Sequence, residues 1–126
     1  MYKKFFLTFS AIALSMGVSA HTQTPAHIQK VGIAPEIPVS ITVNNGRKFT
    51  ADMWVYVDDK KVGQLDGLLS GGSKRFTVGI KVDEDQERKA LVCTEAHPAS
   101  TEIKTSFVSR VCTVVQVYRY PSEEVK

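Results

Sequence analysis

The stretch that decides the fold is Lys48 to Val57, with the sequence KFTADMWVYV. Apolar side chains recur at every second position, and this two-residue period is typical of a β-strand with one buried face. Polar and aromatic side chains, including Trp54 and Tyr56, occupy the positions between them. We therefore expect a strand with one face on a core and two aromatic rings on the other. The apolar face consists of Phe49, Ala51, Met53, Val55 and Val57.

The same period recurs on both sides of this stretch. Val39 to Val43 alternates in the same way, and Asn44-Asn45-Gly46, which follows it, predicts a tight hairpin turn into Lys48–Val57. Asp58 to Lys61 predicts a second turn, with a short return strand over Val62 to Leu65. Further strands are expected over 75–82, 90–95, 101–107 and 111–120. Since no helical period of useful length follows residue 20, the sequence predicts an all-β fold, a small antiparallel β-sandwich of about seven strands.

Cys93 and Cys112 are the only two cysteines, and we predict that they form one disulfide. Both lie in β-patterned runs, and a cysteine pair in a small exported domain is usually a disulfide. The bond would either pin two inward faces together or join neighbouring strands. The architecture is expected to be immunoglobulin-like without being a true immunoglobulin domain. The reasons are that the single tryptophan precedes both cysteines and that Arg110 stands where such a domain has its corner tyrosine.

The first twenty residues have the features of a bacterial secretory signal peptide. Lys3 and Lys4 give a basic start, Phe5 to Val18 is mostly apolar, and Val18-Ser19-Ala20 has the small-x-small pattern that signal peptidase accepts. Cleavage is predicted after Ala20. The apolar run is shorter than the roughly 20 residues of a membrane-spanning helix, so no transmembrane anchor is expected. We expect a periplasmic or secreted protein of the bacterial envelope.

The rest of the chain is expected to have three parts. An extended, proline-containing N-terminal arm covers 21–38, the β-sandwich domain covers 39–120, and a C-terminal tail covers 121–126. The arm is expected to be either a linker or an edge strand waiting for a partner. Loss of Lys3 and Lys4 with the signal reduces 16 basic residues to 14, against 13 acidic ones, which leaves a net charge of +1. A nucleic-acid partner is not expected, because such a partner calls for a strongly basic domain.

Motifs that would indicate catalysis are missing from the sequence. There is no Gly-x-Ser-x-Gly elbow, and Ser70 to Lys74 lacks the first glycine of a phosphate-binding loop. Cys93 and Cys112 are assigned to a disulfide, so neither is a candidate nucleophile. We therefore expect no enzymatic activity.

A copper site is the alternative function. Cleavage after Ala20 would place His21 at the mature N-terminus, where its α-amine and imidazole together can chelate Cu(II). Glu95-Ala96-His97-Pro98 resembles the acidic-x-His-Pro step of CopC-type periplasmic copper proteins, which are small β-sandwiches that also begin with His. This resemblance implies Glu95 and His97 as companions of His21. In the other interpretation, His21 merely follows the signal, and His97-Pro98 forms a turn at a strand end.

The expected binding surface rests on Trp54 and Tyr56. The apolar face of their strand is complete without them, so they are free to contact a partner, unless the second sheet or the N-terminal arm covers them. Tyr118 and Tyr120 are expected to extend the same patch. The sequence predicts a non-enzymatic binding or assembly module, an accessory component of an envelope, secretion or surface assembly, whose partner is another protein or envelope component. A small protein inhibitor of an envelope or host enzyme is a further alternative.

Overall fold

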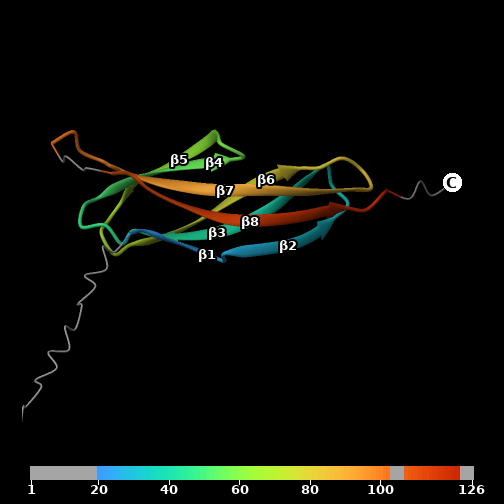
Figure 1. The fold of residues 1–126 in the computed structure, drawn as a ribbon, viewed down its shortest axis with the longest axis horizontal. Coiled ribbons are helices and arrows are strands. Elements are labelled where there is room, and N and C mark those ends of the chain that lie inside the picture. Colours follow the sequence, from blue (N-terminus) through green and yellow to red (C-terminus); the bar gives the residue numbers. More distant parts are fainter. Residues whose placement is uncertain (1–19, 103–106, 123–126) are drawn as a thin grey trace, which may run out of the picture.

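A computed structural model describes residues 20–102 and 107–122. Most of the predicted signal peptide, the middle of the expected strand 101–107 and the end of the tail lie outside these residues. The described chain is all-β, with eight strands in two packed sheets (Figure 1). The strands are β1 (Thr22–Thr24), β2 (His27–Gly32), β3 (Glu36–Asn44), β4 (Ala51–Val57), β5 (Lys60–Leu68), β6 (Ser73–Lys81), β7 (Gln86–Pro98) and β8 (Ser109–Arg119). The immunoglobulin-like sandwich is confirmed, with eight strands in place of about seven.

The two sheets have three and five strands. The smaller sheet has the order β1-β3-β6, and the larger has the order β2-β8-β7-β4-β5. All pairings are antiparallel except that of β2 with β8, which is parallel. The parallel pair therefore joins two strands that lie far apart in the sequence, β2 and β8.

The core lies between the facing sides of the two sheets. In β4, Ala51, Met53 and Val55 are buried while Trp54 and Tyr56 are half-buried, which matches the alternation that the sequence predicts. Two clusters of buried apolar side chains fill the sandwich. One consists of Ile37, Val39, Ile41, Val55, Ile80, Val82, Ala90, Val92, Val115 and Val117, and the other of Val43, Ala51, Met53, Leu68 and Ala96.

The hairpin predicted at Asn44-Asn45-Gly46 is wrong. β3 pairs with β1 and β6, whereas β4 pairs with β5 and β7, so this segment crosses from one sheet to the other. Asn45 is fully buried, and its side-chain amide donates to the carbonyls of Phe49 at 2.8 Å and Leu68 at 2.9 Å. The amide satisfies backbone groups that a hairpin would have paired by itself. The second predicted turn is confirmed, because β4 and β5 form a hairpin around Asp58 and Asp59.

The segment 21–38, predicted as an extended arm that is either a linker or a strand waiting for a partner, contributes strands to both sheets. It is extended, but β1 pairs with β3 and β2 pairs with β8, with Pro25 and Ala26 between β1 and β2. The strand predicted to begin at Val39 begins at Glu36. Pro25 and Pro35 lie between strands and Pro38 lies within β3, and the backbone around them still finds ladder partners. The N-terminal segment thus closes one side of the sandwich by passing from one sheet to the other.

Polar side chains fix β1 against the inner side of β7 and β8. His21 is buried, its Nε2 lies 3.1 Å from the Thr94 carbonyl, and its Nδ1 lies 2.6 Å from the Ser109 hydroxyl. Because the carbonyl only accepts, Nε2 carries the proton, and Nδ1 accepts from Ser109. Gln23 donates to the Val92 carbonyl at 2.8 Å. A network of this kind rigidifies the structure when each polar member is satisfied.

The buried His21 makes stability depend on pH. Burial is the main cause that lowers the pKa of His21 from its usual value of 6.5, and the nearby Arg47 acts in the same direction. The unfolded chain therefore binds more protons than the native protein between these two pKa values, and stability decreases as the pH falls below about 6.5. We expect thermal unfolding midpoints of the wild type to fall more on acidification than those of His21→Asn. Parallel curves for the two proteins would contradict this.

Candidate binding surface

Strand register brings five sequence-distant side chains together on the outer face of the five-stranded sheet. In β4 and β7, Trp54 lies opposite Glu95. In β7 and β8, Glu95 lies opposite Arg110. Tyr56 is on the same side of β4 as Trp54, and His97 is on the same side of β7 as Glu95, since side chains two residues apart share a face. We call these five residues the outer patch.

Trp54 is enclosed by its neighbours in the sheet. The His97 ring stacks on it with centroids 3.7 Å apart and planes at 21°, and the Lys61 ammonium lies 3.9 Å from the indole centroid. Two groups this close to one centroid occupy opposite faces of the ring. Both faces of the half-buried indole are therefore covered and only its rim is open. Tyr56 is half-buried as well, so the expectation of two freely exposed aromatics is corrected.

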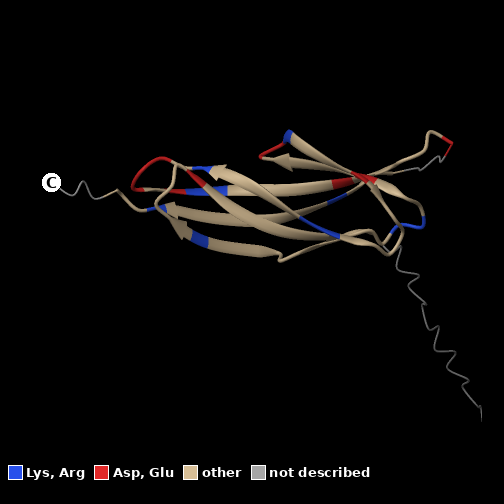
Figure 2. Cartoon of the chain, turned by 180° about the vertical axis from the view of Figure 1, so that it is seen from behind, with Lys and Arg blue, Asp and Glu red and all other residues tan. Residues whose placement is uncertain are grey.

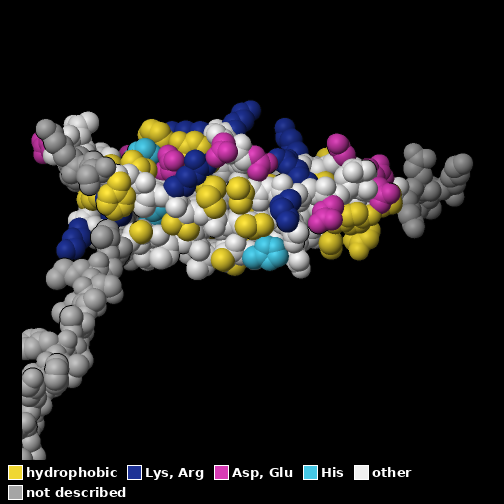
Figure 3. All heavy atoms as spheres, viewed as in Figure 1, with side chains coloured by type: hydrophobic (Ala, Val, Ile, Leu, Met, Phe, Trp, Pro, Cys, Tyr) yellow, Lys and Arg dark blue, Asp and Glu magenta, His cyan; other side chains and the backbone are white. Residues whose placement is uncertain are grey.

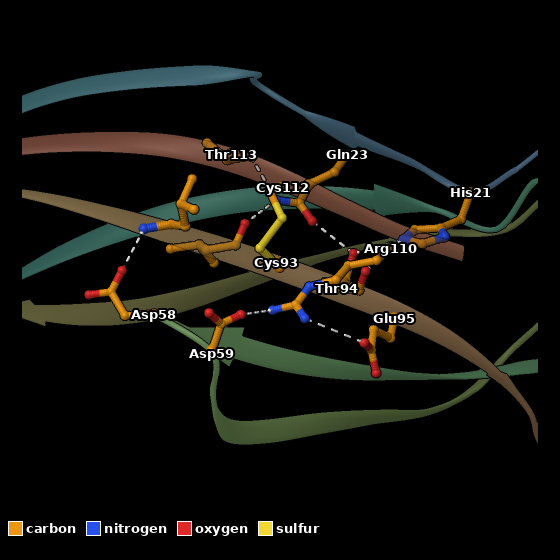
Figure 4. Close-up of a disulfide and its surroundings, with 12 residues drawn as sticks. His21, Gln23, Asp58, Asp59, Cys93, Thr94, Glu95, Arg110, Cys112 and Thr113 are labelled. Atoms are coloured by element: carbon orange, nitrogen blue, oxygen red, sulfur yellow. Dashed lines mark hydrogen bonds and ion pairs between the residues drawn. A yellow bond between two sulfur atoms is a disulfide. The ribbon is translucent and has the colours of Figure 1, made fainter. Parts of the chain in front are cut away.

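Charged groups hold the remainder of the outer patch. One guanidinium nitrogen of Arg110 lies 2.5 Å from an Asp59 oxygen, and the other lies 3.7 Å from Glu95 (Figure 4). His97 Nε2 is 3.2 Å from Glu95. Arg110 also lies over the Tyr56 ring at 5.0 Å. Partial desolvation and the neighbouring Glu95 raise the pKa of the Tyr56 hydroxyl above its ordinary value of 10.0.

The disulfide lies beside the outer patch and is confirmed. Cys93 and Cys112 are direct partners across β7 and β8, with Cα atoms 4.0 Å apart. Of the two arrangements left open by the sequence, the structure has the link between neighbouring strands. The two cysteine side chains lie on the outer face of the five-stranded sheet. Leu91, which is on the same side of β7 as Cys93, is 45 % exposed.

The three predicted copper ligands do not meet. The ring of His21 bonds to Thr94 on the inner side of β7, whereas Glu95 points to the outer side (Figure 4). His97, two residues along the strand from Glu95 and 3.2 Å from it, shares that outer side. Across residues 20–102 and 107–122, no group of three or more His, Cys, Asp or Glu side chains could hold a metal ion. The ligand set of His21, Glu95 and His97 was therefore a wrong prediction, because consecutive residues of a strand face opposite ways.

Tyr118 and Tyr120 form a separate cluster rather than an extension of the outer patch. Their rings meet edge to face with centroids 4.9 Å apart, and the Tyr118 hydroxyl donates to Asp85. Tyr118 lies opposite Glu87, eight residues along β7 from Glu95, or about 26 Å at the rise of a strand. The two aromatic groups thus lie near opposite ends of the sheet.

Sequence reasoning missed Arg110 as a member of the patch. The signal was available, since a cross-strand bond between Cys93 and Cys112 in an antiparallel pair places Glu95 opposite Arg110 by counting two residues from each cysteine. Lys61 and Asp59 had no comparable signal. Their positions depend on the shape of the β4–β5 turn, in which Asp58 and Asp59 both adopt positive φ.

Comparison with known proteins gives a similarity of fold. No family model matches the chain, and a search of curated proteins finds no significant match. Among solved structures, the chain is similar to the Escherichia coli chaperone DraB, with a TM-score of 0.53 and 16 % sequence identity. The match covers 79 % of this chain and 55 % of DraB, so the chain spans about half the length of that chaperone. In the described segments we find no helix with the length and apolar character needed to cross a membrane.

The disulfide is expected to contribute a large share of stability. Cys93→Ala combined with Cys112→Ala should lower the free energy of unfolding by about 3 kcal/mol, because the bond closes a loop of 19 residues in the unfolded chain. Urea unfolding with and without reductant measures the difference. The reduced wild type should match the double variant, and a difference between oxidised and reduced wild type below about 1 kcal/mol would contradict the expectation.

Proposed function

We propose that this protein is a non-enzymatic binding module that acts in the periplasm or outside the cell as an accessory component of an envelope, secretion or surface assembly. The outer patch is the observation that carries the proposal. It holds two aromatic rings, an arginine and a carboxylate on a sheet face that the core does not use. Aromatic residues and arginine are the types most enriched at binding hot spots.

The arrangement of the outer patch favours recognition over catalysis. Glu95 is shared between His97 and Arg110, and Arg110 is also paired with Asp59, so these groups hold one another in place. A preorganised surface loses less side-chain entropy when a partner docks. The patch lies on the open face of a sheet, whereas catalytic groups usually converge in a concave site.

The compartment and the assembly role have separate support. A disulfide is typical of proteins from oxidising compartments, which agrees with the predicted signal peptide. DraB, whose fold is similar, is described as a chaperone. A protein partner in an envelope assembly is consistent with both observations.

Site-specific crosslinking in the native host tests the proposal. A photoreactive amino acid in place of Tyr56 should give a covalent adduct with one defined envelope protein. The same amino acid in place of Thr24, an exposed position of β1, is the matched control and should give none. If the Tyr56 position yields no adduct, or only the adducts that the Thr24 position yields, the outer patch is not the binding surface.

A stability measurement checks that Trp54 is available for binding. Trp54→Ser should lower the free energy of unfolding by about 1 to 2 kcal/mol, the sum expected for a cross-strand stack and a cation–π contact at a half-buried site. Chemical denaturation measures this change. A loss of about 3 to 5 kcal/mol, typical of truncating a core tryptophan, would assign Trp54 to folding instead.

A further inference from the structure

One side of the sandwich is open. β5 ends the five-stranded sheet and β6 ends the three-stranded sheet, so each has a ladder partner on one side only. A cleft of about 500 Å³ lies between them. The residues that line it are Glu36, Val57, Lys60, Val62, Thr77, Val78, Gly79, Lys81 and Arg88.

The floor of this cleft is apolar. Val57 and Val78 are partly buried and pack against the core, and Val62 is 52 % exposed. Within β6, Phe76, Val78 and Ile80 share the inward side, and their exposure decreases toward Ile80. An extended segment beside β6 would bury the uncovered parts of Val62 and Val78, at roughly 25 cal/mol for each Å² of apolar surface.

The rim of the cleft is mainly basic. Lys60 and Lys81 line it together with one carboxylate, Glu36, and β6 itself contains no acidic residue. Arg75 and Lys81 share the outward side of β6, whereas Lys74 is on the inward side with Val78. Figure 2 shows basic residues at both ends of β6, and both basic and acidic residues at the β4–β5 turn. Figure 3 shows Lys and Arg side chains together with Asp and Glu side chains along the upper edge of the molecule in that view. Arg88 is already engaged, since it bonds to Asp58 at 2.8 Å and to the Lys81 carbonyl at 2.6 Å.

We propose that the cleft binds an extended acidic segment of a partner protein, which adds to β6 as a further strand. Its backbone would pair with the free edge of β6, its apolar side chains would pack on Val62 and Val78, and its carboxylates would meet Arg75 and Lys81, which share the other side of β6. A second copy of this chain does not fit, because two β6 edges would bring basic residues opposite each other. This site is separate from the outer patch and does not depend on the proposed function.

Edge lysines also occur where a protein merely prevents unwanted strand pairing. Such protection requires charge at the edge and no apolar floor beside it. The two explanations differ in outcome, because a protective edge rejects every strand, whereas a binding edge accepts a strand with the matching pattern.

Three synthetic peptides of about nine residues, the length of β6, serve as probes. The first alternates Val and Glu, the second alternates Val and Lys, and the third has the composition of the first with all Glu residues at one end. In titrations followed by NMR, the first should shift the β6 amides and slow their hydrogen exchange. The second and third should bind at least about tenfold more weakly.

Charge reversal on β6 gives the matched comparison. Arg75→Glu with Lys81→Glu should weaken binding of the first peptide at least about tenfold, while Lys48→Glu with Lys89→Glu, an equal change of charge at exposed positions elsewhere, should leave it unchanged. If the first pair does not fold, Gln at both positions replaces it.

Four results would overturn the proposal. They are no binding of the first peptide up to about 1 mM, equal binding of all three peptides, shifts centred on β1 or β2, and equal losses in both charge-reversal variants. Trp54→Ser should bind the first peptide like the wild type. Loss of peptide binding at the cleft can therefore be distinguished from loss of partner binding at the outer patch.

Discussion

The pairing of Cys93 with Cys112 is the constraint on which much of the structure depends. In a strand, fixing the direction of one side chain fixes the direction of all the others, because they alternate. With both cysteines pointing outward, Thr94 must point into the sandwich and Glu95 out of it. Thr94 anchors His21, and Glu95 organises the outer patch. One covalent link therefore fixes which side chains of β7 face the internal polar network and which face the external charged patch.

The two long sides of the sandwich are finished in different ways. On one side, the chain passes from β1 to β2 and covers the core, and the buried polar groups of His21 and Gln23 are satisfied by strands of the opposite sheet. On the other side, β5 and β6 face each other across a cleft with valines at its floor. A sandwich of this size has little apolar area to spare, which makes the uncovered valines the less expected of the two arrangements.

Local pattern accounts for most of the fold that could be predicted. The alternation in Lys48–Val57 identified β4 and its buried face, and the location of both cysteines in strands identified the disulfide. Asn44-Asn45-Gly46 misled because the residues that permit a hairpin also permit a crossing between sheets, and only tertiary contacts of Asn45 decide between them. The copper set failed for a similar reason, since sequence proximity of Glu95 and His97 says nothing about the side of the sheet that His21 approaches.

The parallel pairing of β2 with β8 has a consequence for the order of assembly. His27 pairs with Val114, and His21 bonds to Ser109, so contacts of the N-terminal segment close loops of almost the whole domain. Loop closure of that length is entropically costly and slows folding. β1 finds its partner early, in β3, but β2 receives its ladder partner last, and until β8 is complete β2 remains an unpaired strand that is open to pairing with another chain.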